Sequence, residues 1–201
     1  MKKFLIASLA FALPALMFAS NGDEGKTTYT VNVDASTITW KGTKVTGKHD
    51  GTISLKSGEL VFEETTLAGG SFVMDMTSIK NNDMAGSKGA EKLEGHLKSD
   101  DFFGVATYPT AKMDITKVVP YGTAGDYRIT ANLTIKNHTK EVKFMAKVDN
   151  SDGMTAMAEV ELDRSDYDVR YGSGSFFDDL GDKAISDLFS LKIELVFNSA
   201  S

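Results

Sequence analysis

From about residue 29 onward the chain consists largely of short segments in which hydrophobic and polar residues alternate. Phe72, Met74 and Met76, for example, occupy every second position around Asp75. Successive side chains of a strand point to opposite faces, so this alternation indicates strands with one buried face. Segments with this pattern lie at residues 38–40, 53–55, 60–62, 72–76, 113–115, 127–135, 142–148, 154–162 and 189–197.

Residues that favour turns separate these segments, at 56–58, 68–70, 122–125, 136–138 and 149–153. Helical character is confined to residues 89–97, where Leu93 and Leu97 share a face, and to a short stretch at 182–188. Eight or nine strands with short turns and one or two short helices predict an all-β antiparallel barrel or sandwich. We expect it to form one domain over residues 27–199.

Side-chain type favours the barrel over the sandwich. The inward-facing positions mix Met and Phe with small Ala and Gly, which leaves room inside, and a small closed barrel can hold one ligand. Methionine also adapts to irregular apolar surfaces. The alternative interpretation, in which these residues form an ordinary filled core, stays open at this level.

The N-terminal segment has a different character. Lys2 and Lys3 precede an apolar run at 4–19 that Pro14 interrupts, and small and acidic residues follow. This pattern predicts a secretory signal peptide over residues 1–19, cut between about residues 19 and 22. The run is shorter than the roughly 20 apolar residues of a membrane span, and an uncleaved anchor is the alternative. We therefore expect a periplasmic or secreted protein.

Composition narrows the chemistry. The chain contains no cysteine, which excludes disulfides, thiolate metal sites and cysteine nucleophiles. Its net charge is −6 and it carries no basic stripe, so nucleic acid is not an expected partner. His49, His96 and His138 share no strand face or helix turn, so neither a metal site nor a cofactor is expected. His96 is expected to hydrogen-bond backbone or Asp75.

Five groups of residues, in order along the chain, carry a resemblance. They are STITWKGTK at 36–44 with GKHDG at 47–51, LKSG at 55–58, GGSFVMDMTSI at 69–79, KLEGHLKSDDFF at 92–103 with YPTA at 108–111, and NLTIK at 132–136 with RSDYDVRYGSGSFFDDLGDK at 164–183. Together they resemble the YceI-like family over about residues 29–197. The resemblance implies an eight-stranded antiparallel lipocalin-like barrel with a long apolar tunnel. It also implies export to the periplasm, with polyisoprenoids or other long-chain amphiphiles as ligands.

Large apolar side chains are the candidates for lining or plugging this tunnel. They are Trp40, Phe72, Met74, Met76, Phe102, Phe103, Phe144, Phe176 and Phe177. The last two follow a Gly-Ser-Gly-Ser run at 172–175. We interpret this run as a flexible bend that turns both rings inward. It lacks the lysine and helix that follow a phosphate-binding loop.

Two arginines and two tyrosines are the candidates for polar contacts at the barrel mouth. They are Arg164, Tyr167, Arg170 and Tyr171. Arginine is a bidentate partner for phosphate or carboxylate, and tyrosine combines an apolar ring with a hydroxyl group. The alternative is that the arginines pair with nearby acids and pin the segment across the barrel. The acids in reach are Asp166, Asp168 and Asp178.

The preferred functional prediction is a carrier or store for one long apolar chain, without catalysis. An isoprenoid quinone, a polyprenyl lipid and a fatty amide are all compatible ligands. An enzyme acting on such a lipid is the second hypothesis, with His49, Asp75 or His96 as acid–base groups. The third is a ligand-free interaction module with a filled core. A homodimer and a membrane redox or lipid-handling partner are left open.

Overall fold

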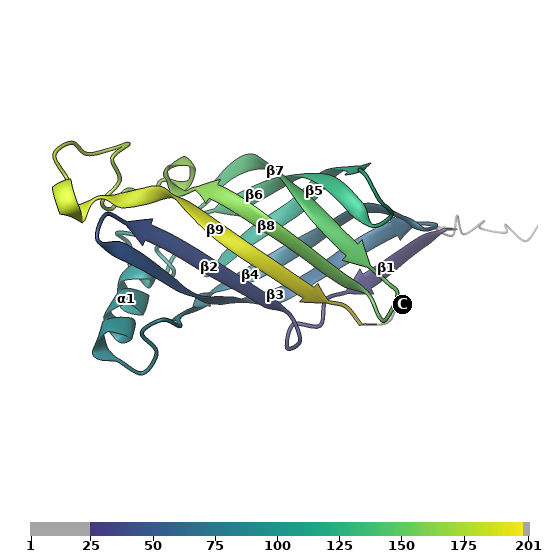
Figure 1. The fold of residues 1–201 in the computed structure, drawn as a ribbon, viewed down its shortest axis with the longest axis horizontal. Helices are drawn as coiled ribbons and strands as arrows, with labels where there is room; N and C mark the ends of the chain where they lie inside the picture. The colour runs from purple at the N-terminus through teal and green to yellow at the C-terminus, as the bar shows by residue number, and fades with distance from the viewer. Residues whose placement is uncertain (1–24, 199–201) are drawn as a thin grey trace, which may run out of the picture.

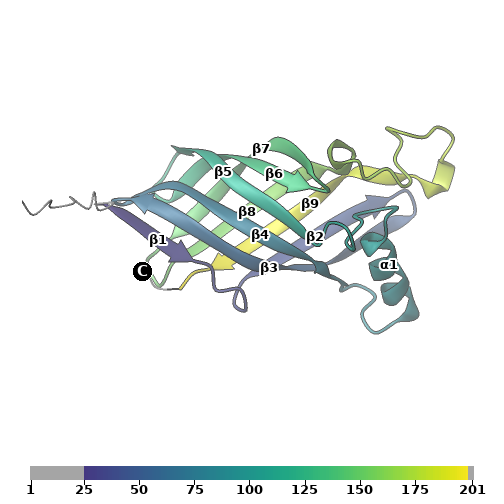
Figure 2. The ribbon, with the colours of Figure 1, turned by 180° about the vertical axis from the view of Figure 1, so that it is seen from behind.

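The computed structural model describes residues 25–198 as a closed barrel with one helix beside its end (Figures 1 and 2). The predicted signal peptide at 1–19, with its cut between 19 and 22, lies outside the described residues. No helix within residues 25–198 is long and apolar enough to cross a membrane.

Nine strands account for most of the described chain. They are β1 (Lys26–Thr30), β2 (Thr37–Lys44), β3 (Gly47–Glu63), β4 (Thr66–Asn81), β5 (Thr110–Pro120), β6 (Asp126–Ile135), β7 (His138–Asp149), β8 (Thr155–Asp163) and β9 (Ile185–Val196). The helix α1 (Lys88–Lys98) follows β4, and two 3₁₀ turns, η1 (Arg164–Tyr167) and η2 (Gly181–Lys183), lie between β8 and β9.

Strands β2 to β9 close into an antiparallel barrel. Their hydrogen-bonded order is β3-β2-β9-β8-β7-β6-β5-β4, and pairing of β4 with β3 completes the circle. This confirms the prediction of an all-β, eight-stranded, lipocalin-like barrel with little helix. The ninth strand, β1, pairs with residues 59–63 of β3, whereas β2 pairs with residues 47–53 on the same long strand. A bridge from Val31 to Phe197 joins the end of β1 to the end of β9.

Two predicted turns are strand interior instead. Residues 56–58 lie within β3 at a register shift, and residues 68–70 lie within β4. The glycines are there because neighbouring strands approach closely. A Cβ atom on Gly58 would lie 2.3 Å from Cδ1 of Phe72, and one on Gly70 would lie 2.5 Å from the carbonyl oxygen of Glu59. The actual turn follows β3, where Glu64 has a φ of 56°.

The helix prediction is confirmed in one place and wrong in the other. Residues 89–97 lie within α1, which begins at Ser87, whose hydroxyl accepts a hydrogen bond from the backbone N–H of Ala90. At 182–188, only the short turn η2 is helical, and Ile185 already opens β9. The alternation that continues from Ile185 into β9 outweighs the local helical tendency, because it places apolar side chains inside the barrel.

The barrel interior contains two apolar clusters. One lies toward the end that carries β1 and includes Val31, Leu60 and Phe62. The other lies toward α1 and includes Met76, Phe102 and Leu162. Most of the second cluster lines the cavity described next, together with Ile38, Leu55, Phe72 and Leu195 of the first, and the rest of the first cluster packs the end that carries β1.

Candidate ligand-binding cavity

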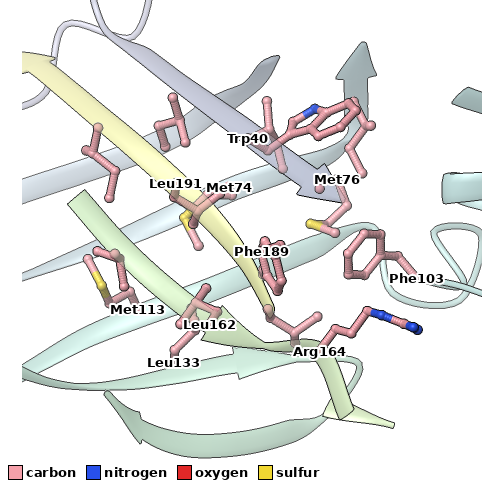
Figure 3. Close-up of a pocket in the computed structure, with 18 of the residues that line it drawn as sticks. Trp40, Met74, Met76, Phe103, Met113, Leu133, Leu162, Arg164, Phe189 and Leu191 are labelled. Carbon is pink, nitrogen blue, oxygen red and sulfur yellow. The ribbon is translucent and has the colours of Figure 1, made fainter. Parts of the chain in front are cut away.

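The barrel holds an apolar cavity to which all eight of its strands contribute. Alternate residues of each strand reach it, for example Phe72, Met74 and Met76 from β4. Leu97 of α1 and the Phe102–Phe103 pair contribute from outside the strands. In Figure 3 the methionine side chains and Phe189 point into the same space. The wall is therefore the inward half of the strand alternation.

The cavity is large enough to take a ligand. The space within it that the centre of a water molecule can reach is about 160 Å³. One water needs roughly 10–15 Å³ on this measure. The side chains of this half of the barrel therefore leave unoccupied volume, unlike an ordinary packed core. Because the wall is apolar, water gains few partners there, and an apolar guest is favoured.

Six of the predicted tunnel residues lie on the cavity wall. They are Trp40, Phe72, Met74, Met76, Phe102 and Phe103. Trp40 is held by its indole N–H, which donates to the carbonyl oxygen of Lys80 at 3.1 Å. The Phe102 and Phe103 rings meet edge to face with centroids 5.1 Å apart. That each of them contacts a ligand remains a prediction.

The other three predicted tunnel residues do not line the cavity. Phe144 is half-buried and packs against both apolar clusters without reaching the wall. Phe176 and Phe177 are 40% and 51% exposed, so their predicted place in the tunnel is wrong. Their backbone N–H groups both donate to the carbonyl of Ser173, which curls the segment into a turn outside the barrel.

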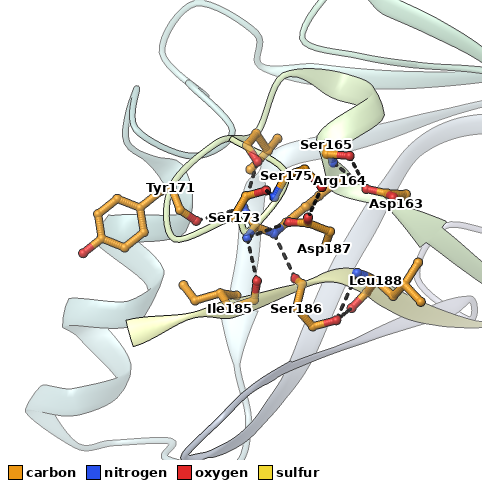
Figure 4. A network of polar contacts seen from close by, with 11 residues as sticks. Asp163, Arg164, Ser165, Tyr171, Ser173, Ser175, Ile185, Ser186, Asp187 and Leu188 are labelled. Carbon is orange, nitrogen blue, oxygen red and sulfur yellow. Dashed lines mark hydrogen bonds and ion pairs between the residues drawn. The ribbon is translucent and has the colours of Figure 1, made fainter. Parts of the chain in front are cut away.

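Arg164 lines the cavity, and its guanidinium group is bound by partners within the protein (Figures 3 and 4). The Nε group donates to the carbonyl of Ser186, Nη1 to those of Val169 and Tyr171, and Nη2 to that of Ile185, at 2.8–3.0 Å. These bonds tie the segment after β8 to the start of β9. The side chain is only 3% exposed.

The counter-ion of Arg164 is Asp187, not one of the three acids considered from the sequence. Asp187 Oδ1 lies 3.1 Å from Nη2, and its Oδ2 accepts a hydrogen bond from the hydroxyl of Ser175. Burial lowers the pKa of Arg164, while Asp187 and Asp163 act to raise it. An arginine with internal partners acts as a structural clamp, which is the kind of role that the alternative interpretation gave it, and contact of Arg164 with a ligand head group remains a prediction.

Tyr167 belongs to the barrel core. It is 2% exposed and packs in the cluster toward α1, away from the cavity wall. Burial raises the pKa of Tyr167 to about 12. It is therefore not a rim residue, and its hydroxyl stays neutral at physiological pH.

Arg170 and Tyr171 lie on the surface of the segment between η1 and η2. Arg170 forms an ion pair with Asp168, one of the acids considered from the sequence, but both belong to the same segment, so the pair does not fasten it across the barrel. The guanidinium carbon of Arg170 lies 5.0 Å from the centroid of the Phe176 ring. Tyr171 is 47% exposed. Its ring and the His96 imidazole are roughly perpendicular, with centroids 4.3 Å apart. Neither lines the cavity.

The residues considered for acid–base chemistry have other partners. His49 Nδ1 lies 2.9 Å from Asp83 Oδ2, whereas Asp75 accepts hydrogen bonds from Thr77. His96 contacts the rings of Phe102 and Tyr171, not Asp75. None of His49, Asp75 and His96 lines the cavity. Within residues 25–198, no group of three or more acidic or histidine side chains is placed to hold a metal ion.

Sequence reasoning missed several wall residues and the polar pair of the clamp. Leu133, Leu162 and Phe189 line the cavity, and each occupies an inward position of the alternation, so the signal for them was present. The pairing of Arg164 with Asp187 carried no such signal, because the two residues lie in different elements, η1 and β9.

Comparison with known proteins agrees with this architecture. A model of the YceI-like domain matches residues 29–197. BcnA of Burkholderia cenocepacia is similar in structure, with a TM-score of 0.66 at 21% identity over 83% of this chain and 98% of BcnA. A polyisoprenoid binding domain from Saccharophagus degradans has a TM-score of 0.60 at 15% identity, over 85% of this chain and 98% of that domain.

The YCEI protein of Campylobacter jejuni is also similar, with a TM-score of 0.51 at 16% identity over 99% of both chains. At these identities the likeness concerns the fold. No curated protein matches the chain significantly. The domain match covers most of the chain, and its span coincides with the barrel and β1. The chain therefore belongs to the YceI-like family.

Proposed function

We propose that this protein binds one long, uncharged apolar lipid, such as an isoprenoid, in the barrel cavity and carries it without chemical change. An isoprenoid quinone, a polyprenyl lipid and a fatty amide fit this description. The observation that carries the proposal is the cavity wall. Eight strands supply apolar side chains, and the one charged group on the wall, Arg164, has its partners within the protein.

The saturated Arg164 narrows the ligand class. A buried phosphate or carboxylate is costly unless a donor pairs with it. Arg164 is the charged residue on the wall, and taking a head group would require it to release backbone carbonyls at the start of β9. A ligand that is neutral along its buried length avoids this cost.

Burial of an apolar chain supplies enough free energy for carriage. Each CH₂ removed from water is worth roughly 0.8 kcal/mol, so about 20 carbons give about 16 kcal/mol gross. Association and ordering cost about 4–15 kcal/mol, which leaves net affinity while permitting release. The same sum argues against burying a much longer chain completely, because its release would be too slow.

The relatives support the lipid class indirectly. The domain from Saccharophagus degradans, which shares this fold, is described as polyisoprenoid binding. The acid–base residues considered for an enzyme lie off the cavity wall, so the geometry favours binding over the second hypothesis.

The experiment that tests the proposal is mass spectrometry of the protein purified from its native host. Native conditions should show a stoichiometric adduct, and denaturing conditions should release a neutral long-chain lipid. Met74→Trp and Met113→Trp, which fill the cavity, should lose the adduct, while Met157→Trp on the outer surface should keep it. A bare protein mass that is unchanged after incubation with quinones and polyprenols would contradict the proposal.

We further infer that the carrier works in the periplasm, on the strength of the N-terminal charge and apolar pattern at residues 1–19. The intact mass of the same preparation tests this, because an exported chain should begin between about residues 19 and 22. A mass that retains Met1 in the cytoplasmic fraction would contradict it.

A further inference from the structure

The shortest seam of the barrel wall lies between β7 and β8. Their ladder contains four residue pairs, from Asp149 with Thr155 to Ala146 with Ala158. The flanking seams are much longer, with ten pairs between β6 and β7 and nine between β8 and β9. Figure 1 shows β7 and β8 side by side near the arrowhead of β7 and apart toward its start. Residues 138–145 and 159–163 therefore face each other without pairing.

This unpaired stretch is a slot with defined ends. One end is closed by the Ala146–Ala158 pair, where the β7–β8 ladder begins. At the other end, beside η1, Lys140 Nζ lies 3.1 Å from Asp166 Oδ1, and Lys136 Nζ donates to the carbonyl of Asp168 at 2.9 Å. Between these two ends, no ion pair among the described residues joins β7 to β8. Lys143 pairs with Glu141 on its own strand, at 2.8 Å.

The slot lies directly beside the cavity. Val142 on one side and Val160 and Leu162 on the other line the cavity wall. A surface groove lies at the end of the slot where the ladder begins, lined by Met145, Met157 and their neighbours on β7 to β9. Ile193 of β9 lines both this groove and the cavity, so the two spaces lie on opposite sides of the same part of the wall.

The exposure of β7 shows that the wall is thin here. The inward residues Ile129 and Ala131 of β6 are 2% and 0% exposed. Their counterparts on β7, Val142 and Phe144, are only half-buried, although they face the same interior. Met145 and Met157, on the outer surface of the two strands, are 44% and 48% exposed.

We propose that the slot between β7 and β8 is a side entrance through which the apolar chain of the ligand reaches the cavity, with the Phe144 ring as its gate. The proposal rests on the lipid-binding function inferred above. Widening the slot breaks no ladder pair. The β4–β5 seam is also short, with five pairs, but its unpaired stretch lies at the end packed by the first cluster, beside Leu67 and Ile115. The far end of the barrel is filled by side chains, and Arg164 fastens the segment at the mouth.

The test is to tie the slot shut and follow ligand exchange. The chain has no native cysteine, so Lys143→Cys with Glu161→Cys introduces the only thiols, one on each side of the slot. A short bis-maleimide joins them. Glu161→Cys with Ser190→Cys is the matched control, because Glu161 and Ser190 are ladder partners at the same height on the intact β8–β9 seam. The probe is all-trans-retinol, a neutral fluorescent isoprenoid alcohol.

Cross-linking the slot should slow both association and dissociation of retinol by at least about tenfold. A route that breaks one backbone hydrogen bond has a barrier higher by roughly the free energy of that bond, which corresponds to about this factor in rate. The control cross-link should leave both rates unchanged. Equal rates in the two cross-linked proteins would overturn the side entrance while leaving the carrier intact. If retinol fails to bind the protein before cross-linking, the carrier function fails, and the entrance falls with it.

A second variant tests the gate. Phe144→Ala removes the ring from the slot and should raise both exchange rates without any cross-link. Val119→Ala, at an exposed position of β5 that lines neither the cavity nor the groove, is the control. Rates in Phe144→Ala equal to those of the control would overturn the role of Phe144.

Discussion

At the scale of single residues, Arg164 shows how a buried charge can serve the fold and not the ligand. Its donors bind four backbone carbonyls that belong to the segment after β8 and to the start of β9. The geometry of a guanidinium, with several N–H groups in one plane, suits this task in a way that lysine cannot match. The clamp thereby shapes the cavity mouth that it also lines.

Arg164→Ala should lower the free energy of unfolding by about 3–5 kcal/mol, because it strands Asp187 and several carbonyls without partners. Arg170→Ala is the control and should change stability by less than about 1 kcal/mol, since exposed ion pairs contribute little. Urea unfolding measures both variants. Equal losses in the two would show that the Arg164 clamp adds no stability.

Tyr167 should give the protein an alkaline limit. An unfolded tyrosine ionises near pH 10, whereas burial raises the pKa of Tyr167 to about 12. The folded state therefore holds this proton longer, and the corresponding stability is complete below about pH 10 and is lost as the pH rises toward 12. Absorbance titration at alkaline pH should show one late-ionising tyrosine, and Tyr167→Phe should lack it. A single step shared by all tyrosines would contradict this.

At the scale of elements, contacts between neighbouring strands decide where glycine is required. Gly69 and Gly70 are adjacent in β4 but face different surroundings, since a Cβ atom at Gly69 would meet nothing within 4 Å. At Gly70 it would meet the backbone of β3 at 2.5 Å. Gly70→Ala should therefore destabilise the protein by about 1–3 kcal/mol through overpacking. Gly69→Ala should stay within about 0.5 kcal/mol. Thermal unfolding of the matched pair measures the difference, and equal midpoints would contradict it.

The link between β3 and the loop before α1 is sensitive to acid. Asp83 accepts hydrogen bonds from His49, the backbone N–H of Asp50 and the Asn81 amide. The His49 bond is the largest cause that lowers the pKa of Asp83 from 3.8 to about 2. A depressed pKa means that the stability from this carboxylate is present above about pH 4 and is lost as the pH falls toward 2.

Asp83→Asn should therefore be less stable than the parent protein at neutral pH, and the gap should close as the pH falls from 4 to 2. Urea midpoints at several pH values measure the gap. Asp152→Asn, in the exposed turn before β8, is the control and should show no such trend. A gap that does not change with pH would contradict the role of Asp83.

At the scale of the whole molecule, the barrel divides its interior between stability and binding. The half that carries β1 is packed with side chains, and the half beside α1 keeps an apolar cavity. Unfilled volume costs stability because the wall atoms lack contacts on one side. A bound chain restores those contacts, so ligand and fold should stabilise each other.

Retinol at about 100 times its dissociation constant should raise the free energy of unfolding by about 2.7 kcal/mol, as linkage requires. Thermal unfolding of delipidated protein with and without retinol measures the shift. Met74→Trp, with the cavity filled, should be insensitive to retinol. A parent protein that is equally insensitive would contradict binding in the cavity.

Strand alternation alone predicted much of this architecture. The inward positions of β4, at Phe72, Met74 and Met76, are on the cavity wall as the period of two requires. The predictions from glycine were less successful. The Gly-Ser-Gly-Ser run does not turn Phe176 and Phe177 inward, because the segment forms a turn outside the barrel. At residues 56–58 glycine marks a close contact between strands and not a turn.

The sequence by itself determined the all-β class, the inward face of most strands and the family to which the chain belongs, since these depend on local periodicity and local motifs. Only the tertiary structure decided that β4 closes on β3, that Arg164 pairs with Asp187, and that the seam between β7 and β8 stops at Ala146. Each of these joins elements whose relative position no local pattern encodes. The physical reason is that hydrogen-bond partners and packing volume are properties of the closed barrel, not of any one segment.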